Sequence, residues 1–280
     1  MKIAATVEEI RSAVKAWKKE GLSVGFVPTM GYLHEGHQSL MQKAVSENDR
    51  VVVSIFVNPM QFGPSEDLES YPRDLEKDAS LCEASGVDLI FHPEPKEMYH
   101  PDFSSFVDMH GLTESLCGKS RPAHFRGVCT VVTKLFNIVQ PDRAYFGQKD
   151  AQQLAVIQQM VRDLNLDVTV IGCPIIREAD GLAKSSRNSY LSADERKAAL
   201  VLSQALEVAK QLLANGEQNA AKIRNAISET IQAEPLAKVD YVELVDARTL
   251  QQVDSVERPV LVALAVYSGK TRLIDNFITE

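Results

Sequence analysis

Short runs of β-branched and aromatic residues recur along the first part of the chain, each with the length of a strand. We expect strands at Leu22–Val27, Arg50–Val57, Val87–Phe91, Arg143–Phe146 and Asp167–Cys173. Helical patterns lie between these runs, one of them at residues 153–165. This alternation predicts a parallel sheet with helices on both faces, in which ligands gather at the carboxyl ends of the strands.

The pattern changes after about residue 176. Residues 192–216 read as one amphipathic helix that Ser192 caps and Gly216 ends, and its apolar face carries Leu202, Leu206, Ala209 and Leu213. A second helix follows, and residues 240–250 and 260–277 read as antiparallel strands. We therefore expect two domains, at residues 1–176 and 177–280, the second a smaller α+β domain.

Composition and charge narrow the class of protein. The 280 residues are 45% hydrophobic and 24% charged, which is typical of a globular chain. The net charge of −8 disfavours a large nucleic-acid surface, although a few local donors could still hold a nucleotide. The first residues read as an amphipathic helix with acids, and no apolar run is long enough to span a bilayer. We expect a cytoplasmic enzyme without a membrane anchor.

The cysteines predict neither a zinc site nor a redox pair. They stand at positions 82, 117, 129 and 173, without a Cys-x-x-Cys pair and without histidines at zinc-ligand spacing. Cys129 and Cys173 lie in apolar runs, where a buried thiol is expected. Free thiols fit a reduced compartment.

The first strand runs into a glycine-bearing turn with two histidines, PTMGYLHEGH at residues 28–37, and a helical pattern follows. This places His34 and His37 at a helix N-terminus, where N–H groups attract anions, while Gly36 lets a phosphate approach the backbone. A histidine pair at this spacing is otherwise typical of a metal site or of surface polarity. Its place between a strand and a helix favours phosphate binding.

A second polar motif, DGLAKSSRN at residues 180–188, combines hydroxyls, a guanidinium and an amide behind a flexible glycine. Such a segment suits a mobile clamp for a polyphosphate, and equally a polar turn between domains. Together, the two motifs resemble the class I synthetase and nucleotidyltransferase superfamily with its His-x-Gly-His turn. Its members bind ATP so that an acid or phosphate oxygen attacks the α-phosphate in line.

Three further polar clusters narrow the resemblance. They lie at residues 53–62 (VSIFVNPMQF), 122–127 (PAHFRG) and 145–154 (YFGQKDAQQL). Amides suit a substrate rich in hydroxyl and carboxylate oxygens, and Lys149 suits a phosphate, although each cluster alone is more typical of a structural role. In this order, and with RLIDN at residues 272–276, they closely resemble the pantothenate synthetase (pantoate–β-alanine ligase) family over nearly the whole chain.

The resemblance implies an α/β fold and a reaction. Residues 1–176 would form a Rossmann-like parallel sheet that binds ATP and pantoate, and residues 177–280 a smaller C-terminal lid domain. The chain would condense (R)-pantoate with β-alanine to pantothenate through a pantoyl adenylate, with release of AMP and pyrophosphate. It would use ATP with Mg²⁺ and no bound organic cofactor, and would form a cytoplasmic homodimer without nucleic-acid or membrane partners.

The resemblance also assigns roles to single residues, and no metal ligand from the protein is among them. The catalytic residues would be His34, His37 as proton donor, and Lys149. Gln61 would contact pantoate and the β-alanine site, Gln153 would contact pantoate, and Asn58 and Arg121 are further candidates near pantoate and the phosphates. The ATP-binding residues would be Met30, Gly31, Tyr32, Leu33, His34, Glu35, Gly36, His37, Gly147, Gln148, Lys149, Asp150, Ile176, Lys184, Ser185, Ser186 and Arg187.

Four residues depart from the usual pattern of the family. Tyr32 stands where a small residue is usual, Cys117 and Gln148 where glutamate is usual, and Lys184 where an apolar residue is usual. Lys184 either adds charge beside phosphates or points to solvent.

Two other functions fit part of the motifs. A nucleotidyltransferase that moves AMP or CMP onto a phosphorylated alcohol shares the histidine turn but has no use for the amide cluster. A binding module without catalysis needs fewer charges than His37, Lys149 and Arg187 supply.

Overall fold

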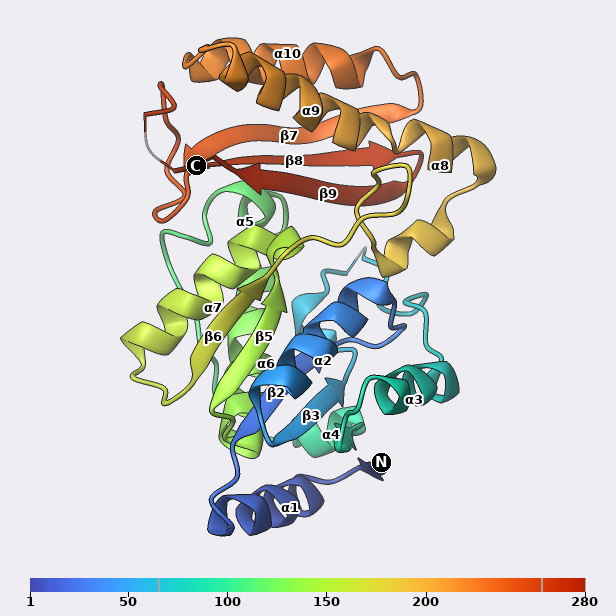
Figure 1. Cartoon of the computed structure of the whole chain (residues 1–280), viewed down its shortest axis with the longest axis vertical. Helices are drawn as coiled ribbons and strands as arrows, with labels where there is room; N and C mark the ends of the chain where they lie inside the picture. Colours follow the sequence, from blue (N-terminus) through green and yellow to red (C-terminus); the bar gives the residue numbers. More distant parts are fainter. Residues whose placement is uncertain (65, 258, 280) are drawn as a thin grey trace. The chain divides into compact units, whose positions relative to one another are not determined.

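The computed structural model describes residues 1–64, 66–257 and 259–279 (Figure 1). The chain divides into two compact units. Unit 1 comprises Met1–His110, Arg121–Gln148 and Gln153–Pro174, and unit 2 comprises Gly111–Ser120, Lys149–Gln152 and Ile175–Glu280. Two short segments from the first part of the sequence thus belong to unit 2. The lid role predicted for residues 177–280 stays a prediction.

Unit 1 is built on a six-stranded parallel sheet with the strand order β1-β4-β3-β2-β5-β6. The strands are β1 (Lys2–Ala4), β2 (Val24–Thr29), β3 (Arg50–Ile55), β4 (Leu89–Phe91), β5 (Arg143–Gly147) and β6 (Thr169–Cys173). The part β4-β3-β2-β5-β6 has the strand order of a Rossmann-like sheet. The direction in which successive strands are added to the sheet reverses between β2 and β5. Ligands of such sheets bind outside the carboxyl ends of the strands at this reversal.

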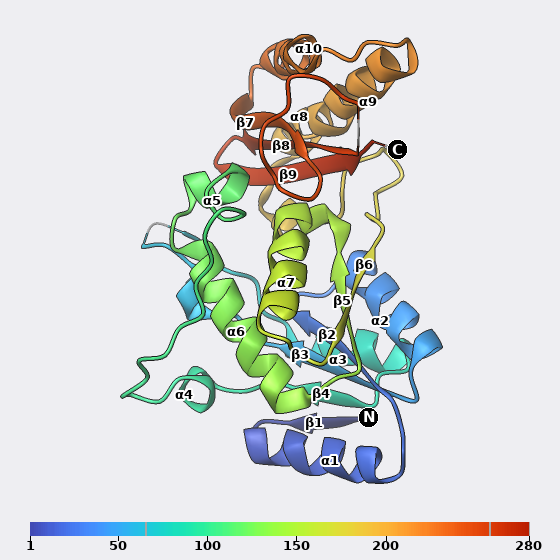
Figure 2. The same cartoon turned by 90° about the vertical axis from the view of Figure 1, so that its left-hand side faces the viewer.

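Helices cover both faces of this sheet (Figures 1 and 2). Because successive side chains of a strand point to opposite faces, neighbouring residues meet different helices. Val27, Val53 and Tyr145 share a buried cluster with Met41, whereas Phe26 on the opposite face meets Phe136 edge-on at 6.4 Å. The helices with residues in unit 1 are α1 (Val7–Lys19), α2 (Glu35–Glu47), α3 (Leu75–Ala84), α4 (Pro95–Met98), α6 (His124–Val139) and α7 (Ala151–Asp163).

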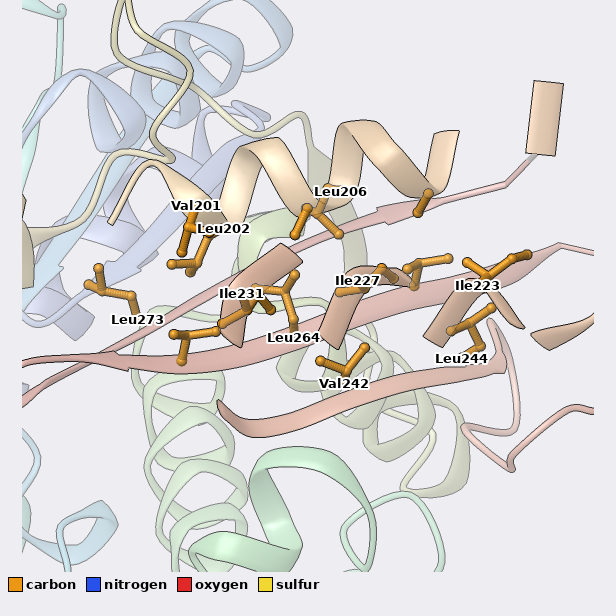
Figure 3. Packing of buried hydrophobic residues seen from close by; sticks show 14 of the residues in the cluster. Val201, Leu202, Leu206, Ile223, Ile227, Ile231, Val242, Leu244, Leu264 and Leu273 are labelled. Carbon is orange, nitrogen blue, oxygen red and sulfur yellow. The ribbon is translucent and has the colours of Figure 1, made fainter. Parts of the chain in front are cut away.

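Unit 2 is an antiparallel sheet packed against two helices. The strands are β7 (Ala237–Asp246), β8 (Val260–Ser268) and β9 (Thr271–Ile278), and β8 lies in the middle. Side chains from α9 (Val201–Ala214) and α10 (Ala220–Gln232) form one buried cluster with the strands (Figure 3). The remaining helices are α5 (Leu116–Ser120) and α8 (Ala193–Ala198).

The predicted fold class is confirmed, since a parallel α/β sheet and a smaller antiparallel sheet are both present. The five predicted strands of the parallel sheet all form, with each bound within two residues of the expected one. The strand predicted at residues 240–250 forms at Ala237–Asp246, and the stretch 260–277 holds two strands, β8 and β9. Two local predictions were incomplete. The first residues were read only as helix, whereas Lys2–Ala4 pair with β4 and Thr6 caps α1 in a capping box with Glu9.

The long helix predicted at residues 192–216 is two helices, α8 and α9. Between them, Leu200 N–H bonds to Lys197 O and Leu202 N–H to Ala199 O, which are three-residue bonds in place of the four-residue bonds of an α-helix. Ser268 on β8 also donates its hydroxyl to Glu195 O, at 2.8 Å. Periodicity cannot show such a tertiary contact.

The cysteines are free thiols, and Cys82, Cys129 and Cys173 are buried, as the apolar runs around the latter two predicted. Burial raises the pKa of the Cys82 and Cys129 thiols to about 12. Within the described ranges, no helix is both long and apolar enough to cross a membrane.

Candidate active site

The turn after β2 is held in an unusual backbone conformation. Thr29 Oγ1 donates to Ser54 O at 2.7 Å and accepts from Gly31 N at 3.2 Å. Gly31 has φ +84° and Tyr32 has φ +51°, so two consecutive residues lie in the left-handed region. This region favours glycine and costs about 1–2 kcal/mol for a residue with a side chain such as Tyr32. Other groups must therefore stabilise the turn.

Asp78 on α3 supplies that stabilisation. Its carboxylate accepts hydrogen bonds from Tyr32 N at 2.8 Å and from Leu33 N at 2.6 Å, and the residue is only 1% exposed. A Cβ added to Gly31 would lie 3.0 Å from both Asp78 Oδ2 and Ile55 Cγ2, so a side chain there would crowd the carboxylate. Burial raises the pKa of Asp78, and the hydrogen bonds from Leu33 and Tyr32 oppose that rise.

His34 and His37 lie at the N-terminus of α2, as predicted. His34 is the N-cap, and its Nδ1 accepts from Gly36 N at 3.1 Å. His37 Nδ1 accepts in turn from His34 N at 3.3 Å, which completes a reciprocal cap. The ring centroids are 4.1 Å apart.

The main chain determines the tautomer of both rings. An amide N–H can only donate, so each Nδ1 that accepts from one must be unprotonated. The neutral ring of His34 and that of His37 therefore each carry their proton on Nε2. Each Nε2–H is a hydrogen-bond donor at the positive end of α2, an arrangement suited to anionic oxygens.

Two predicted substrate residues, Asn58 and Gln61, meet at the end of β3. Gln61 ends the 3₁₀ turn Pro59–Gln61, and its Nε2 lies 3.1 Å from Met30 Sδ, in the turn after β2. Asn58 is 1% exposed and donates through Nδ2 to Gln61 Oε1 at 3.1 Å. Met30 follows β2 and Gln61 follows β3, as the prediction of polar motifs after strands required, and the structure shows that these two strands are neighbours.

Arg121, also predicted near the substrate, is engaged by an acid. Its Nε donates to Glu66 Oε1 at 2.7 Å, and its Nη2 donates to the other oxygen of Glu66 and to Gln61 O. His124 Nδ1 also lies 2.9 Å from Gln61 O. Burial would raise the pKa of Glu66, but hydrogen bonds and charge from Arg121 outweigh it and hold the pKa below its ordinary value. In this arrangement, Arg121 holds the main chain of Gln61.

The end of β5 lies beside the end of β2, at the reversal of strand order. Phe26 on β2 pairs with Ala144 on β5, so Gly147, which ends β5, and Gln148, which follows it, lie at the same edge of the sheet as the histidine turn. Gln153 is half-buried on α7. These three residues belong to unit 1, whereas the next predicted residues, Lys149 and Asp150, belong to unit 2.

Within unit 2, Lys149 lies near the serine loop. Lys149 O accepts from Asn276 Nδ2 at 2.8 Å, and Lys149, Ser185 and Asn188 are among the residues that line one small cavity. The cavity, about 10 Å³, has room for one water and none for a phosphate group. It is a gap in the packing of this region, so a phosphate would have to bind outside it.

Ile176 and Lys184 are paired across a short hairpin. Lys184 N donates to Ile176 O at 2.9 Å, and Arg177 forms an isolated bridge with Ala183. Arg177 makes two bonds to Asp275, at 2.6 and 2.9 Å. Asp275 is 1% exposed, and the ion pair anchors the base of the hairpin to β9.

A second group of ion pairs, around Arg196, holds the start of the motif at residues 180–188. Arg196 on α8 donates to Glu178 at 2.6 Å and to Asp180 at 2.8 Å. Asn188 Nδ2 donates to Glu178 Oε1 at 3.0 Å. Ser185 caps the 3₁₀ turn Ser186–Tyr190, which carries Ser186 and Arg187. The predicted clamp is thus a shaped loop attached to unit 2 at both ends.

Sequence reasoning missed several residues that hold these motifs. Asp78 has one visible signal, because a charged residue stands one helical turn before the buried Cys82 on α3. Tyr99, whose hydroxyl donates to Asn58 Oδ1 at 2.8 Å, has none. Glu66, Glu178 and Arg196 read in the sequence as ordinary surface charge.

The family model for pantoate-beta-alanine ligase matches residues 2–278. Among curated relatives, a pantothenate synthetase from Enterococcus faecalis is 64% identical over 280 residues, covering 100% of this chain and 99% of the relative. One from Clostridium acetobutylicum is 61% identical over 277 residues, covering 99% of each chain.

Solved structures agree with these relatives. The crystal structure of a pantothenate synthetase from Thermus thermophilus matches with a TM-score of 0.94 at 46% identity, over 99% of each chain. A pantoate-beta-alanine ligase from Francisella tularensis, complexed with beta-gamma ATP and beta-alanine, matches with a TM-score of 0.81 at 36% identity, over 99% of this chain and 97% of that one. The chain therefore belongs to the pantoate-beta-alanine ligase family and is a ligase.

Proposed function

We propose that the chain condenses (R)-pantoate with β-alanine to pantothenate in two steps that consume ATP. In the first, a carboxylate oxygen of pantoate attacks the α-phosphorus of ATP, and the bond from that phosphorus to the oxygen bridging to the β-phosphate breaks. Pyrophosphate leaves and pantoyl adenylate remains. In the second, the amine of β-alanine attacks the acyl carbon, AMP leaves, and the amine nitrogen loses its proton.

The observation that carries this proposal is the donor pair at the start of α2. Both Nδ1 atoms accept from the main chain, so His34 and His37 offer Nε2–H donors beside the N–H groups of a helix N-terminus. Donors arranged in advance stabilise charge as it develops on a leaving oxygen. In the proposed reaction, that oxygen belongs to pyrophosphate, and the donor is His37.

The choice of substrates is supported by the relatives. The Francisella tularensis ligase was crystallised with beta-gamma ATP and beta-alanine, and we propose the same two ligands for this chain. The amide of Gln61, which lies against Met30 at the strand ends, suits an oxygen-rich acid such as pantoate. Gln153 is proposed as a second pantoate contact on the family resemblance.

The roles of the unit 2 residues are also proposals. Lys149 and the loop at residues 184–187 would bind phosphates, Ile176 would contact adenine, and residues 177–280 would act as a lid. Mg²⁺ would enter bound to ATP, because it prefers phosphate and water oxygens with few protein ligands. We further propose, on the resemblance, that the ligase works in the cytoplasm as a homodimer.

Isotope exchange tests the two-step scheme. Labelled pyrophosphate should exchange into ATP when pantoate is present and β-alanine is absent, because the first step is then reversible on its own. A reaction without pantoate is the control and should show no exchange. Exchange that required β-alanine, or ADP in place of AMP as product, would refute the adenylate.

A further inference from the structure

The hydrogen bonds of Asn58 leave this side chain no donor or acceptor to spare. Nδ2 donates to Gly127 O at 3.1 Å and to Gln61 Oε1 at 3.1 Å. Oδ1 accepts from Met60 N at 3.3 Å and from Tyr99 O–H at 2.8 Å. A side-chain amide has two N–H donors and two acceptor lone pairs, so all four positions are used.

The orientation of this amide follows from the chemistry of its partners. Gly127 O can only accept a hydrogen bond, so Asn58 Nδ2 must face it. Met60 N–H can only donate, so Asn58 Oδ1 must face that group. Nδ2 then also faces Gln61, and the atom of Gln61 that meets it must be the acceptor Oε1. The side-chain nitrogen of Gln61 is therefore turned away from Asn58.

The other end of the Gln61 amide faces a weak partner. Its Nε2 lies 3.1 Å from Met30 Sδ, and a thioether sulfur is a poor acceptor. Gln61 is 9% exposed, so this donor is largely withdrawn from water. A substrate oxygen that replaced the sulfur contact would form a stronger bond to the same N–H group.

Close packing and aromatic rings keep the arrangement in place. A Cβ on Gly127 would lie 2.3 Å from Met60 O, so only glycine allows α6 to approach the turn this closely. The ring of Tyr99 packs edge-on against Phe103, with centroids 5.0 Å apart. Burial raises the pKa of Tyr99 well above its ordinary value, so its hydroxyl keeps the proton that it donates.

We propose that Tyr99 and Asn58 are positioning residues that fix the Gln61 amide with its N–H group toward the substrate, so that Gln61 recognises an acceptor oxygen of pantoate. The inference rests on the proposed function and adds the direction of the hydrogen bond and the two residues that set it. The oxygen belongs to a hydroxyl or carboxylate group, each of which can accept.

Steady-state kinetics with pantoate, ATP and β-alanine test the proposal. Tyr99→Phe keeps the ring and removes one bond to Asn58, and it should raise KM for pantoate about five- to tenfold, with KM for ATP within twofold of wild type. Gln61→Glu keeps an acceptor for Asn58 but puts a carboxylate oxygen where the donor stood. It should raise KM for pantoate about 10²-fold or more, since a polar group left facing a like group discriminates strongly.

Tyr145→Phe is the matched control. Tyr145 is a buried tyrosine of unit 1 whose hydroxyl bonds to Glu47 at 2.9 Å and to Asn48 at 2.7 Å. The Tyr145→Phe variant should lose thermal stability, as Tyr99→Phe does, but its KM for pantoate should stay at the wild-type value. Equal pantoate effects in the two tyrosine variants would overturn the positioning role, and so would an unchanged KM for pantoate in Gln61→Glu. A wild-type chain without pantoate-dependent ligation would instead overturn the proposed function.

Discussion

Replacing Asp78 tests whether a carboxylate outside the predicted motifs controls the histidine turn. Asp78→Asn keeps the shape of the side chain but retains one acceptor oxygen where two were used. Either Tyr32 N–H or Leu33 N–H then faces an amide NH₂ group in a largely dry position. A buried donor without its partner costs about 1–3 kcal/mol, and the turn also holds Tyr32 at φ +51° against a cost of about 1–2 kcal/mol.

These energies are comparable, so the turn should relax in the variant. Tyr32 would move toward negative φ, and the shift would reach His34, two residues further along, whose ring caps α2. Displacement of reacting groups by about 1 Å costs roughly 10²-fold in rate. We therefore expect kcat/KM for ATP to fall about 10- to 10²-fold, with KM for β-alanine changed little.

Asp88→Asn is the control for this experiment. Asp88 also accepts a main-chain bond in the parallel sheet, from Val51 N at 2.8 Å, but at the amino end of β3, away from the histidine turn. Urea unfolding should show comparable losses of stability for the two variants, while ATP kinetics should change only for Asp78→Asn. ATP parameters within twofold of wild type in a destabilised Asp78→Asn would show that Asp78 is purely structural.

Two further predictions concern the histidine turn and the ion pair beside Gln61. His37→Ala should slow pyrophosphate exchange about 10²–10³-fold, which is the usual effect of losing a transition-state donor. The reaction of ready-made pantoyl adenylate with β-alanine should stay near normal. Equal losses in both reactions would refute the donor role. Glu66→Gln should lower the free energy of unfolding by about 1 kcal/mol at neutral pH. Because the pKa of Glu66 is lowered in the folded state, the stabilisation by its carboxylate is present above about pH 4.3 and is lost as the pH falls through the folded-state pKa. In acid denaturation, the difference in unfolding free energy between wild type and Glu66→Gln should therefore disappear in this range. A difference that did not depend on pH would contradict the prediction.

The chemistry-bearing motifs could be predicted because each is local in sequence. A strand, a glycine turn and a helix lie together in residues 24–47, so the sequence alone placed His34 and His37 at a helix N-terminus. The strand order then brings Gly147 to the same edge of the sheet, as the general rule for parallel sheets requires.

The residues that hold these motifs could not be predicted in the same way. Asp78 lies 45 residues from Leu33 along the chain, and Tyr99 lies 41 residues from Asn58. Their partners are main-chain groups or amides, which leave no charge pattern in the sequence. Which oxygen or nitrogen of Gln61 faces a ligand also depends on Gly127 O, a group that every residue carries and that only the fold brings into place.

Three side chains of the candidate site in unit 1, those of His34, His37 and Gln61, each present an N–H donor, and this shared polarity is a stronger argument about the ligand than any single residue. Main-chain N–H groups turn the rings of His34 and His37 so that Nε2–H donates, and Asn58 turns Gln61 so that its amide N–H donates. A site of donors fits ligands rich in acceptors, such as a polyphosphate and a hydroxy acid. Two acceptor oxygens that face each other cost more binding free energy than the loss of one hydrogen bond. Gln61→Glu, which replaces the donor by an acceptor, should therefore weaken pantoate binding more than Tyr99→Phe does.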